Sequence, residues 1–217
     1  MQINTIIDQL SQDDSNAPLP VEAIQEAKKN GPEFFPYVDE VIDKFIKKPS
    51  ALTDEERSLL FFGVLLLAEM KQVQSFEKLL QMCSREDNWE SDLEEVLGDA
   101  ITELMPTVFY FLADGESAAL NKFILDTHPS EYCRAAAIET LFQQYTDEAI
   151  EPETFTAMFE QWIERFLEEQ DPDLSAFILT SLCNLAMTAD LKQYKDRFLE
   201  LDENCLLYTS PSPRDGI

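Results

Sequence analysis

Apolar residues recur along the chain with the spacing of one face of an α-helix, and no stretch alternates with the period of two that is typical of a β-strand. Four segments superpose so that five apolar columns align. These columns are Leu59, Val96, Cys133 and Leu174; Gly63, Ala100, Ala137 and Ile178; Val64, Ile101, Ile138 and Leu179; Leu67, Leu104, Leu141 and Leu182; and Ala68, Met105, Phe142 and Cys183. The copies are 37, 37 and 41 residues apart. This period predicts stacked helix pairs, an α-solenoid.

Helix-start signals and the segments between the four copies complete the predicted repeat. Thr53 with Glu56, and Ser91 with Glu94, have the spacing of a capping box. The predicted partner helices span 75–83, 116–125, 152–169 and 190–201, and an earlier, divergent pair spans 20–30 and 34–48. A helix carrying Ile3, Ile6, Ile7 and Leu10 is predicted to close the open end of the stack. We therefore expect an all-α solenoid of about five helix pairs with an N-terminal capping helix.

One stretch resembles a known repeat. Residues 123–141, FILDTHPSEYCRAAAIETL, are similar to a HEAT repeat: a turn with Asp and Pro precedes a helix bearing Arg134, Ala137, Ile138 and Leu141. Residues 166–186 form a weaker copy with Ser175 in place of the Arg. As a whole, residues 20–201 resemble a family of uncharacterised bacterial proteins of HEAT-like type. The resemblance implies the fold and leaves the activity open. In such relatives a cysteine-rich, zinc-binding SEC-C segment can follow the helices, and this sequence shows none.

The net charge of the chain limits which classes of molecule are expected to bind it. The chain has 16 Lys and Arg against 43 Asp and Glu, a formal net charge of -27. Such a surface repels nucleic-acid phosphates and anionic lipid headgroups and attracts proteins with basic patches. The N-terminus lacks the features of a secretory signal, and the most apolar run, 59–68, is half the length of a membrane span of about 20 residues. We expect a cytoplasmic protein that binds neither nucleic acid nor membranes.

The sequence contains little that points to catalysis. The single histidine, His128, falls in a turn and is interpreted as a solvent-exposed turn residue. Cys83, Cys133, Cys183 and Cys205 show no metal-ligand spacing, which favours reduced thiols. No glycine-rich phosphate loop and no nucleophile elbow occurs. We expect no cofactor, no metal and no enzymatic activity.

The helix predicted at 54–70 differs from its counterparts on the side opposite the core columns. Phe61, Phe62 and Leu65 are apolar there, whereas the other copies carry polar residues. Two interpretations remain open: the N-terminal segment covers these residues, or they form an exposed apolar anchor in an acidic groove. In the second case the polar surroundings are predicted to include Tyr132, Glu139, Gln143 and Asn184. The function then expected is a non-enzymatic scaffold that binds a protein or peptide with a basic surface on its concave side.

The C-terminal residues 205–217 break the acidic, helical pattern. Back-translation of 205–215 yields one reading frame of a transposon-end adapter used in preparing sequencing libraries, so we interpret this tail as non-native and disordered. The predicted domain is therefore 1–204, truncated at its C-terminal end. Two alternative functions follow: an accessory or metal-dependent protein whose zinc-binding or reactive part is missing, and an acidic decoy for a nucleic-acid-binding protein.

Overall fold

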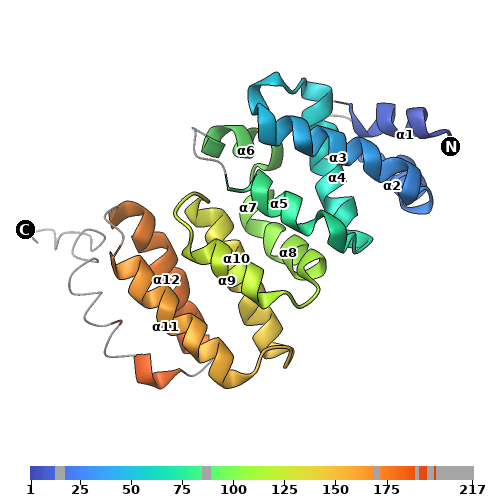
Figure 1. Cartoon of the computed structure of the whole chain (residues 1–217). Helices are drawn as coiled ribbons and strands as arrows, with labels where there is room; N and C mark the ends of the chain where they lie inside the picture. The colour runs from blue at the N-terminus through green and yellow to red at the C-terminus, as the bar shows by residue number, and fades with distance from the viewer. Residues whose placement is uncertain (13–17, 85–88, 169–171, 189–190, 195–197, 199–217) are drawn as a thin grey trace, which may run out of the picture. The chain divides into compact units, whose positions relative to one another are not determined.

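The computed structural model describes the whole chain except residues 13–17, 85–88, 169–171, 189–190, 195–197 and 199–217. The described residues form twelve α-helices and three short 3-10 helices and contain no β-strand (Figure 1). The predicted all-α class is thereby confirmed. The tail predicted at 205–217 lies outside the described residues. The chain divides into two compact units, Met1–Phe155 and Thr156–Ile217, which are described separately below.

The first unit opens with four α-helices that the apolar pattern predicted and one short 3-10 helix that it did not. The α-helices are α1 (Ile3–Leu10), α2 (Val21–Lys29), α3 (Gly31–Lys47) and α4 (Asp54–Glu69), and the 3-10 helix η1 (Pro49–Ala51) lies between α3 and α4. Helix α1 packs against α2, α3 and α4, and its Ile6 and Leu10 are fully buried. The helix predicted from the spacing of these residues is thus present, with its apolar face in the core.

Helices α3 and α4 approach each other closely at Gly63. A Cβ atom added to Gly63 would lie 2.6 Å from Cγ1 and 2.9 Å from Cγ2 of Val38, which is itself fully buried in α3. Real Cβ atoms do not approach carbon atoms that closely, so only glycine permits this spacing. The small residue in the second apolar column therefore sets how deeply α4 packs against α3.

The N-terminus of α4 is held by the capping box that the sequence predicted. The Glu56 N–H donates to Thr53 Oγ1 at 3.3 Å, and the Thr53 N–H donates to Glu56 Oε2 at 2.9 Å. The Lys44 ammonium of α3 lies 2.8 Å and 2.5 Å from the two carboxylate oxygens of Glu56. Burial acts to raise the pKa of Glu56, but the hydrogen bonds from Lys44 and the Thr53 N–H outweigh it and lower this pKa.

The Glu56→Gln variant should therefore lose stability in a pH-dependent way. A carboxyl whose pKa is lower in the folded state stabilises the fold above its unfolded pKa and loses that effect as the pH falls through its folded pKa. We expect Glu56→Gln to lower the free energy of unfolding by about 0.5–1 kcal/mol at pH 7, since the capping hydrogen bond survives and the ion pair does not. Urea unfolding from pH 7 to pH 3 should show this difference shrinking. The same change at the exposed Glu103 is the control, and a pH-independent difference would contradict the assignment.

The next part of the chain departs from the predicted repeat. It contains the 3-10 helix η2 (Val73–Ser75), α5 (Phe76–Met82), α6 (Trp89–Leu97), α7 (Ala100–Glu103) and α8 (Met105–Ala113). The predicted helix start at Ser91 was wrong, because α6 begins two residues earlier at Trp89. The prediction of one continuous helix through the second copy was also wrong. Gly98 adopts φ +50 and its N–H donates to Glu94 O at 2.8 Å, so it ends α6 in the left-handed conformation.

The break at Gly98 changes which residues of the second copy reach the core. Ala100, Ile101 and Met105 are buried as the columns predicted. Leu104 stands at the junction of α7 and α8 and is 38% exposed, so its place in the fourth column was wrong. The physical reason is that interrupting a helix rotates the side chains beyond the break away from the face they would otherwise share.

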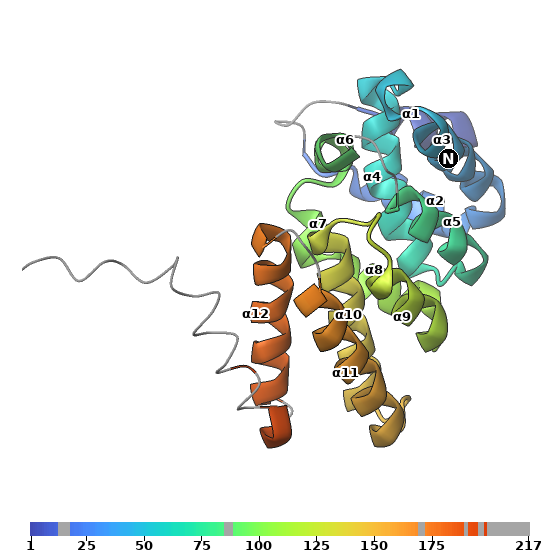
Figure 2. The ribbon, with the colours of Figure 1, turned by 60° about the vertical axis from the view of Figure 1, so that its left-hand side comes forward.

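Helix α8 links two of the predicted repeat helices. It packs against both α4 and α10 (Glu131–Thr146), and both views place it between them (Figure 1, Figure 2). The Thr140 hydroxyl of α10 lies 2.9 Å from both Pro106 O of α8 and Ala136 O of its own helix, so these two carbonyls share its one hydrogen. Near the opposite end of α8, Tyr110 donates its hydroxyl to Asp147 Oδ2 at 2.6 Å. Hydrogen bonds at two separate points therefore fix α8 along α10.

Helix α9 (Ser117–Leu125) and helix α10 form the stretch that resembles a HEAT repeat. Ala137, Ile138 and Leu141 are fully buried, as their columns predicted. Arg134 is only 3% exposed, and its Nε donates to Ile124 O at 2.8 Å. This carbonyl belongs to the last turn of α9, where carbonyls have no partner within the helix. The Arg134 side chain thus caps the C-terminus of the preceding helix.

The second unit contains most of α11 (Pro152–Glu168), which begins in the first unit, and α12 (Pro172–Thr188). Phe159, Trp162, Ile163 and Phe166 of α11 are buried at helical spacing. The Phe159 ring lies 5.1 Å, centroid to centroid, from the ring of Tyr194 in the 3-10 helix η3 (Lys192–Tyr194). An α-helix was predicted over 190–201; within its described part the first turn is this 3-10 helix instead.

Candidate functional site

The outward side of α4 carries a continuous stripe of residues that the core columns do not use. We call it the α4 outer stripe; it comprises Asp54, Arg57, Ser58, Phe61, Phe62 and Leu65. Their spacing of i, i+3, i+4, i+7, i+8 and i+11 places them along one face of the helix. All except the exposed Asp54 are half-buried. The stripe is polar and charged at its N-terminal end and apolar at its C-terminal end.

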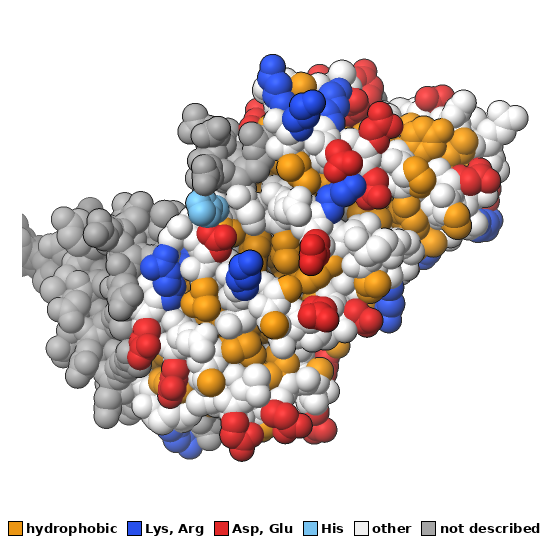
Figure 3. Space-filling view, in the orientation of Figure 1, with side chains coloured by type: hydrophobic (Ala, Val, Ile, Leu, Met, Phe, Trp, Pro, Cys, Tyr) orange, Lys and Arg blue, Asp and Glu red, His pale blue; other side chains and the backbone are white. Residues whose placement is uncertain are grey.

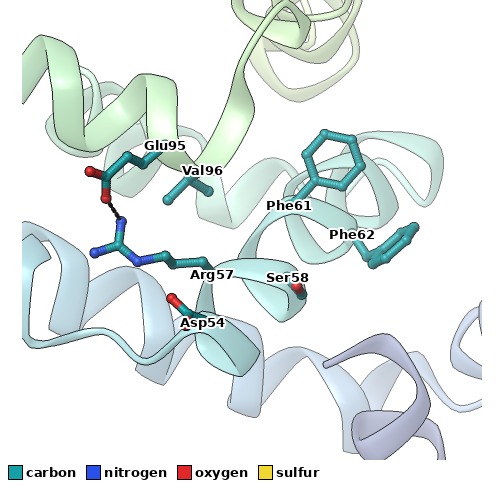
Figure 4. Close-up of a pocket in the computed structure, with 7 residues that line it drawn as sticks. All are labelled: Asp54, Arg57, Ser58, Phe61, Phe62, Glu95 and Val96. Carbon is teal, nitrogen blue, oxygen red and sulfur yellow. Dashed lines mark hydrogen bonds and ion pairs between the residues drawn. The ribbon is translucent and has the colours of Figure 1, made fainter. Parts of the chain in front are cut away.

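Helix α6 completes a pocket beside this stripe. Asp54, Arg57, Ser58, Phe61 and Phe62 of α4, with Glu95 and Val96 of α6, line an open hollow of about 490 Å³ (Figure 4). We call this hollow the α4–α6 pocket. Its volume lies within the range of about 300–1,000 Å³ that is common for ligand pockets. The rings of Phe61 and Phe62 are edge to face, with centroids 5.4 Å apart.

The charges of the pocket are arranged around a single cation. Arg57 reaches across from α4 and donates through Nη1 to Glu95 Oε2, which joins the two walls (Figure 4). The Arg57 side chain is 19% exposed and that of Glu95 is 59% exposed. Asp54 lies on the same side of the pocket (Figure 4). Two carboxylates thus accompany one guanidinium, and the pocket has an excess of negative charge.

The structure brings together only part of the predicted partner-binding set. Phe61 and Phe62 line the pocket, and Leu65 follows one turn later on the same stripe. All three side chains are half-buried. The sequence had left open whether they are covered or exposed, and their burial lies between these two cases. None of the predicted polar surroundings is among the residues that line the pocket. Tyr132, Glu139 and Gln143 belong to α10, where Gln143 donates to Asp147 Oδ1 at 2.9 Å, and Asn184 belongs to α12 in the second unit.

Sequence reasoning missed the residues that supply the pocket's charge. Asp54 and Arg57 are seven and four residues before Phe61, so extending the helical face toward the N-terminus of α4 would have found them. Glu95 carries no such signal, because only the packing of α6 against α4 brings it to Arg57. Val96 was assigned to a core column; it is buried, as that column predicted, and it also lines the pocket.

The comparison with known protein families covers nearly the whole chain. Residues 1–206 match the family described as a protein of unknown function, DUF1186. The chain belongs to the DUF1186 family. Neither a curated protein nor a solved structure matches this DUF1186 chain.

The surface of the DUF1186 chain agrees with its acidic composition. On the face shown in Figure 3, Asp and Glu side chains are dispersed among hydrophobic ones rather than gathered in one patch. Among the described helices, none is both long and apolar enough to cross a lipid bilayer. In the same residues, no three His, Cys, Asp or Glu side chains lie close enough together to hold a metal ion.

His128 of this DUF1186 chain occupies the turn between α9 and α10. Asp126 Oδ1 accepts a hydrogen bond from the His128 N–H at 3.0 Å and lies 2.5 Å from its ring Nδ1. The His128 side chain is exposed, so its interpretation as a solvent-exposed turn residue is confirmed.

Two thiols of the DUF1186 chain meet in the core. Cys83 and Cys133 are both free and fully buried, which confirms the predicted reduced core thiols at these positions. Their mutual hydrogen bond, together with burial, raises the pKa of the Cys83 thiol well above its usual range. A thiol of high pKa carries little of the reactive thiolate at neutral pH.

We expect Cys83 and Cys133 to resist alkylation in the folded protein. With iodoacetamide at pH 8, both should react at least about tenfold more slowly than after unfolding in guanidinium, because reaction requires exposure and deprotonation. The half-buried Cys183 should react sooner. Peptide mass spectrometry over a time course measures each site. Labelling of native Cys83 at the rate of the unfolded chain would show that the two thiols are not buried together.

Proposed function

We propose that this DUF1186 protein is a non-enzymatic scaffold of HEAT-like helix pairs that binds a protein partner at the α4–α6 pocket. The observation that carries the proposal is the α4 outer stripe, where Phe61, Phe62 and Leu65 remain half-buried although the opposite face of α4 is packed in the core. Apolar side chains beside an open pocket are a common means of holding a partner peptide.

Burial along the predicted columns supports the repeat architecture. In both α4 and α10 the first four column positions are buried, and in α12 the described second, third and fourth positions are buried as well. In a stack of HEAT-like pairs the α4 outer stripe would face the concave side. The net charge of -27 supports a partner with a basic surface and argues against nucleic acid and anionic membranes.

A selection from random peptides tests the proposal while the partner is still unidentified. We suggest panning a phage-displayed library of random 12-residue peptides on the full chain and measuring the best binder by fluorescence polarisation. The Phe61→Ala/Phe62→Ala variant should bind that peptide at least about tenfold more weakly, because central aromatic residues dominate binding energy at such sites. The control is Tyr37→Ala, which removes an exposed aromatic ring from α3 outside the pocket.

A second variant keeps the test valid if loss of two aromatic rings disturbs the fold. Ser58→Trp adds a bulky side chain to the pocket lining and removes no core atoms, and it should weaken binding to a similar degree. Thermal unfolding checks that each variant is folded. Unchanged affinity in both variants, or a selection that yields no peptide, would refute a binding role for the pocket.

A further inference from the structure

The α4 outer stripe changes character along its length. Asp54 begins the stripe, Arg57 and Ser58 follow, and Phe61 and Phe62 come two turns after Asp54. Seven residues at 1.5 Å each separate Asp54 from Phe61 by about 10 Å along the helix axis. A ligand that contacts the aromatic rings therefore meets carboxylates at a defined distance, in one direction along α4.

The charges in the pocket favour a cation at that position. Arg57 is already paired with Glu95, whereas Asp54 has no ion-pair partner among the described residues. Glu95 is 59% exposed and engages Arg57 through one oxygen, so its carboxylate remains accessible. The positive end of the α4 dipole favours an anion, but Asp54, Glu55 and Glu56 already offset it in the first turn. An approaching carboxylate or phosphate would meet two like charges and one compensated guanidinium.

The spacing of the charged and aromatic ends of the pocket favours an extended ligand. A short peptide that contacts both ends has to bridge about 10 Å along α4. An extended segment in the polyproline II conformation spans about 9 Å in three residues, and its three residues per turn place positions i and i+3 on the same side of the chain. In a β-strand these two side chains would point to opposite faces.

Building on the proposed function, we infer that the α4–α6 pocket recognises an extended peptide segment that carries a large apolar residue and, three residues away, a Lys or Arg. The apolar side chain contacts Phe61, Phe62 and Val96, and the cation lies beside Asp54 and Glu95. The net charge of the whole chain draws such basic segments to the surface and accelerates their association.

Two biased peptide libraries test the charge and the spacing directly. Both fix a Phe; one fixes a Lys three residues from it, in either chain direction, and the other fixes a Glu there. The wild-type chain should enrich binders from the Lys library only. Asp54→Lys should weaken the best Lys peptide by at least about threefold, the scale of an exposed ion pair, and shift enrichment toward the Glu library. Affinity of the wild type for the Lys peptide should also fall with added salt.

A matched control separates a local effect from a change in overall charge. Glu153→Lys reverses an exposed acid in the first turn of α11, so it alters net charge and dipole position as Asp54→Lys does, but outside the pocket. It should leave the preference for Lys peptides intact. Equal enrichment from both libraries, with binding still dependent on Phe61 and Phe62, would overturn the charge assignment and leave the proposed function standing. Binders that ignore Phe61 and Phe62 would overturn both.

Discussion

Replacing Gly63 by alanine is expected to destabilise the protein by about 1–3 kcal/mol, although alanine is the better helix former by about 1 kcal/mol. The added methyl group would lie 2.6 Å from Val38 Cγ1, and Val38 is fully buried and branched at Cβ, so it has little freedom to move aside. The helices α3 and α4 would have to separate. Urea unfolding of the full chain, followed by far-UV circular dichroism, measures the loss.

The double variant Val38→Ala/Gly63→Ala tests whether this contact is the cause. Removing the two γ-methyl groups of Val38 creates space for the new methyl, so the two changes should couple favourably by about 1 kcal/mol or more. The single Val38→Ala variant is the reference because it opens a cavity of its own. Strictly additive losses would show that crowding against Val38 is not what makes alanine unfavourable at position 63.

Replacing Arg134 by alanine should cost about 3 kcal/mol of folding free energy. The change leaves Ile124 O without its buried donor and opens a cavity where a side chain with only 3% exposure was packed. Thermal and urea unfolding of the variant would quantify the loss.

Arg134→Met separates the two contributions. Methionine fills much of the same volume and donates no hydrogen bond, so its cost should be about 1–2 kcal/mol and should measure the polar interactions of the guanidinium, which include the cap on α9. If alanine and methionine were equally damaging, packing would contribute nothing; if methionine were harmless, the cap would contribute nothing.

Helix-start signals in the sequence predicted helix boundaries of the first unit correctly in some places and wrongly in others. Thr53 and Glu56 predicted the start of α4, and both capping hydrogen bonds are present. The same spacing at Ser91 and Glu94 led to a wrong prediction, since α6 begins at Trp89. A Ser and a Glu three residues apart also fit inside a helix. A lone glycine is tolerated within a helix, so the break at Gly98 could not be predicted; its left-handed conformation depends on the turn into α7.

Helix α8 was not predicted for a different physical reason. Its sequence, MPTVFYFLA, is apolar in almost every position and shows no amphipathic period, because α4 and α10 cover it from two sides. The pocket likewise contains residues that could be predicted and a residue that could not. Phe61, Phe62 and Leu65 were found because they contrast with polar residues in the other copies, whereas Glu95 joins them only through tertiary packing. Periodicity shows which residues share one face of a single helix. It does not show which residues of two different helices come together in a site.

Because α8 packs against both α4 and α10, its loss would expose buried surface on each of them at once. In a simple stack each repeat contacts only its neighbours, and local opening can stay local. Here the two predicted repeat helices share one intermediary, so we expect their slowest amide hydrogens to exchange at similar rates, through a common opening of the first unit. A helix that packs against both α4 and α10 would thus make the folding of the first unit more cooperative.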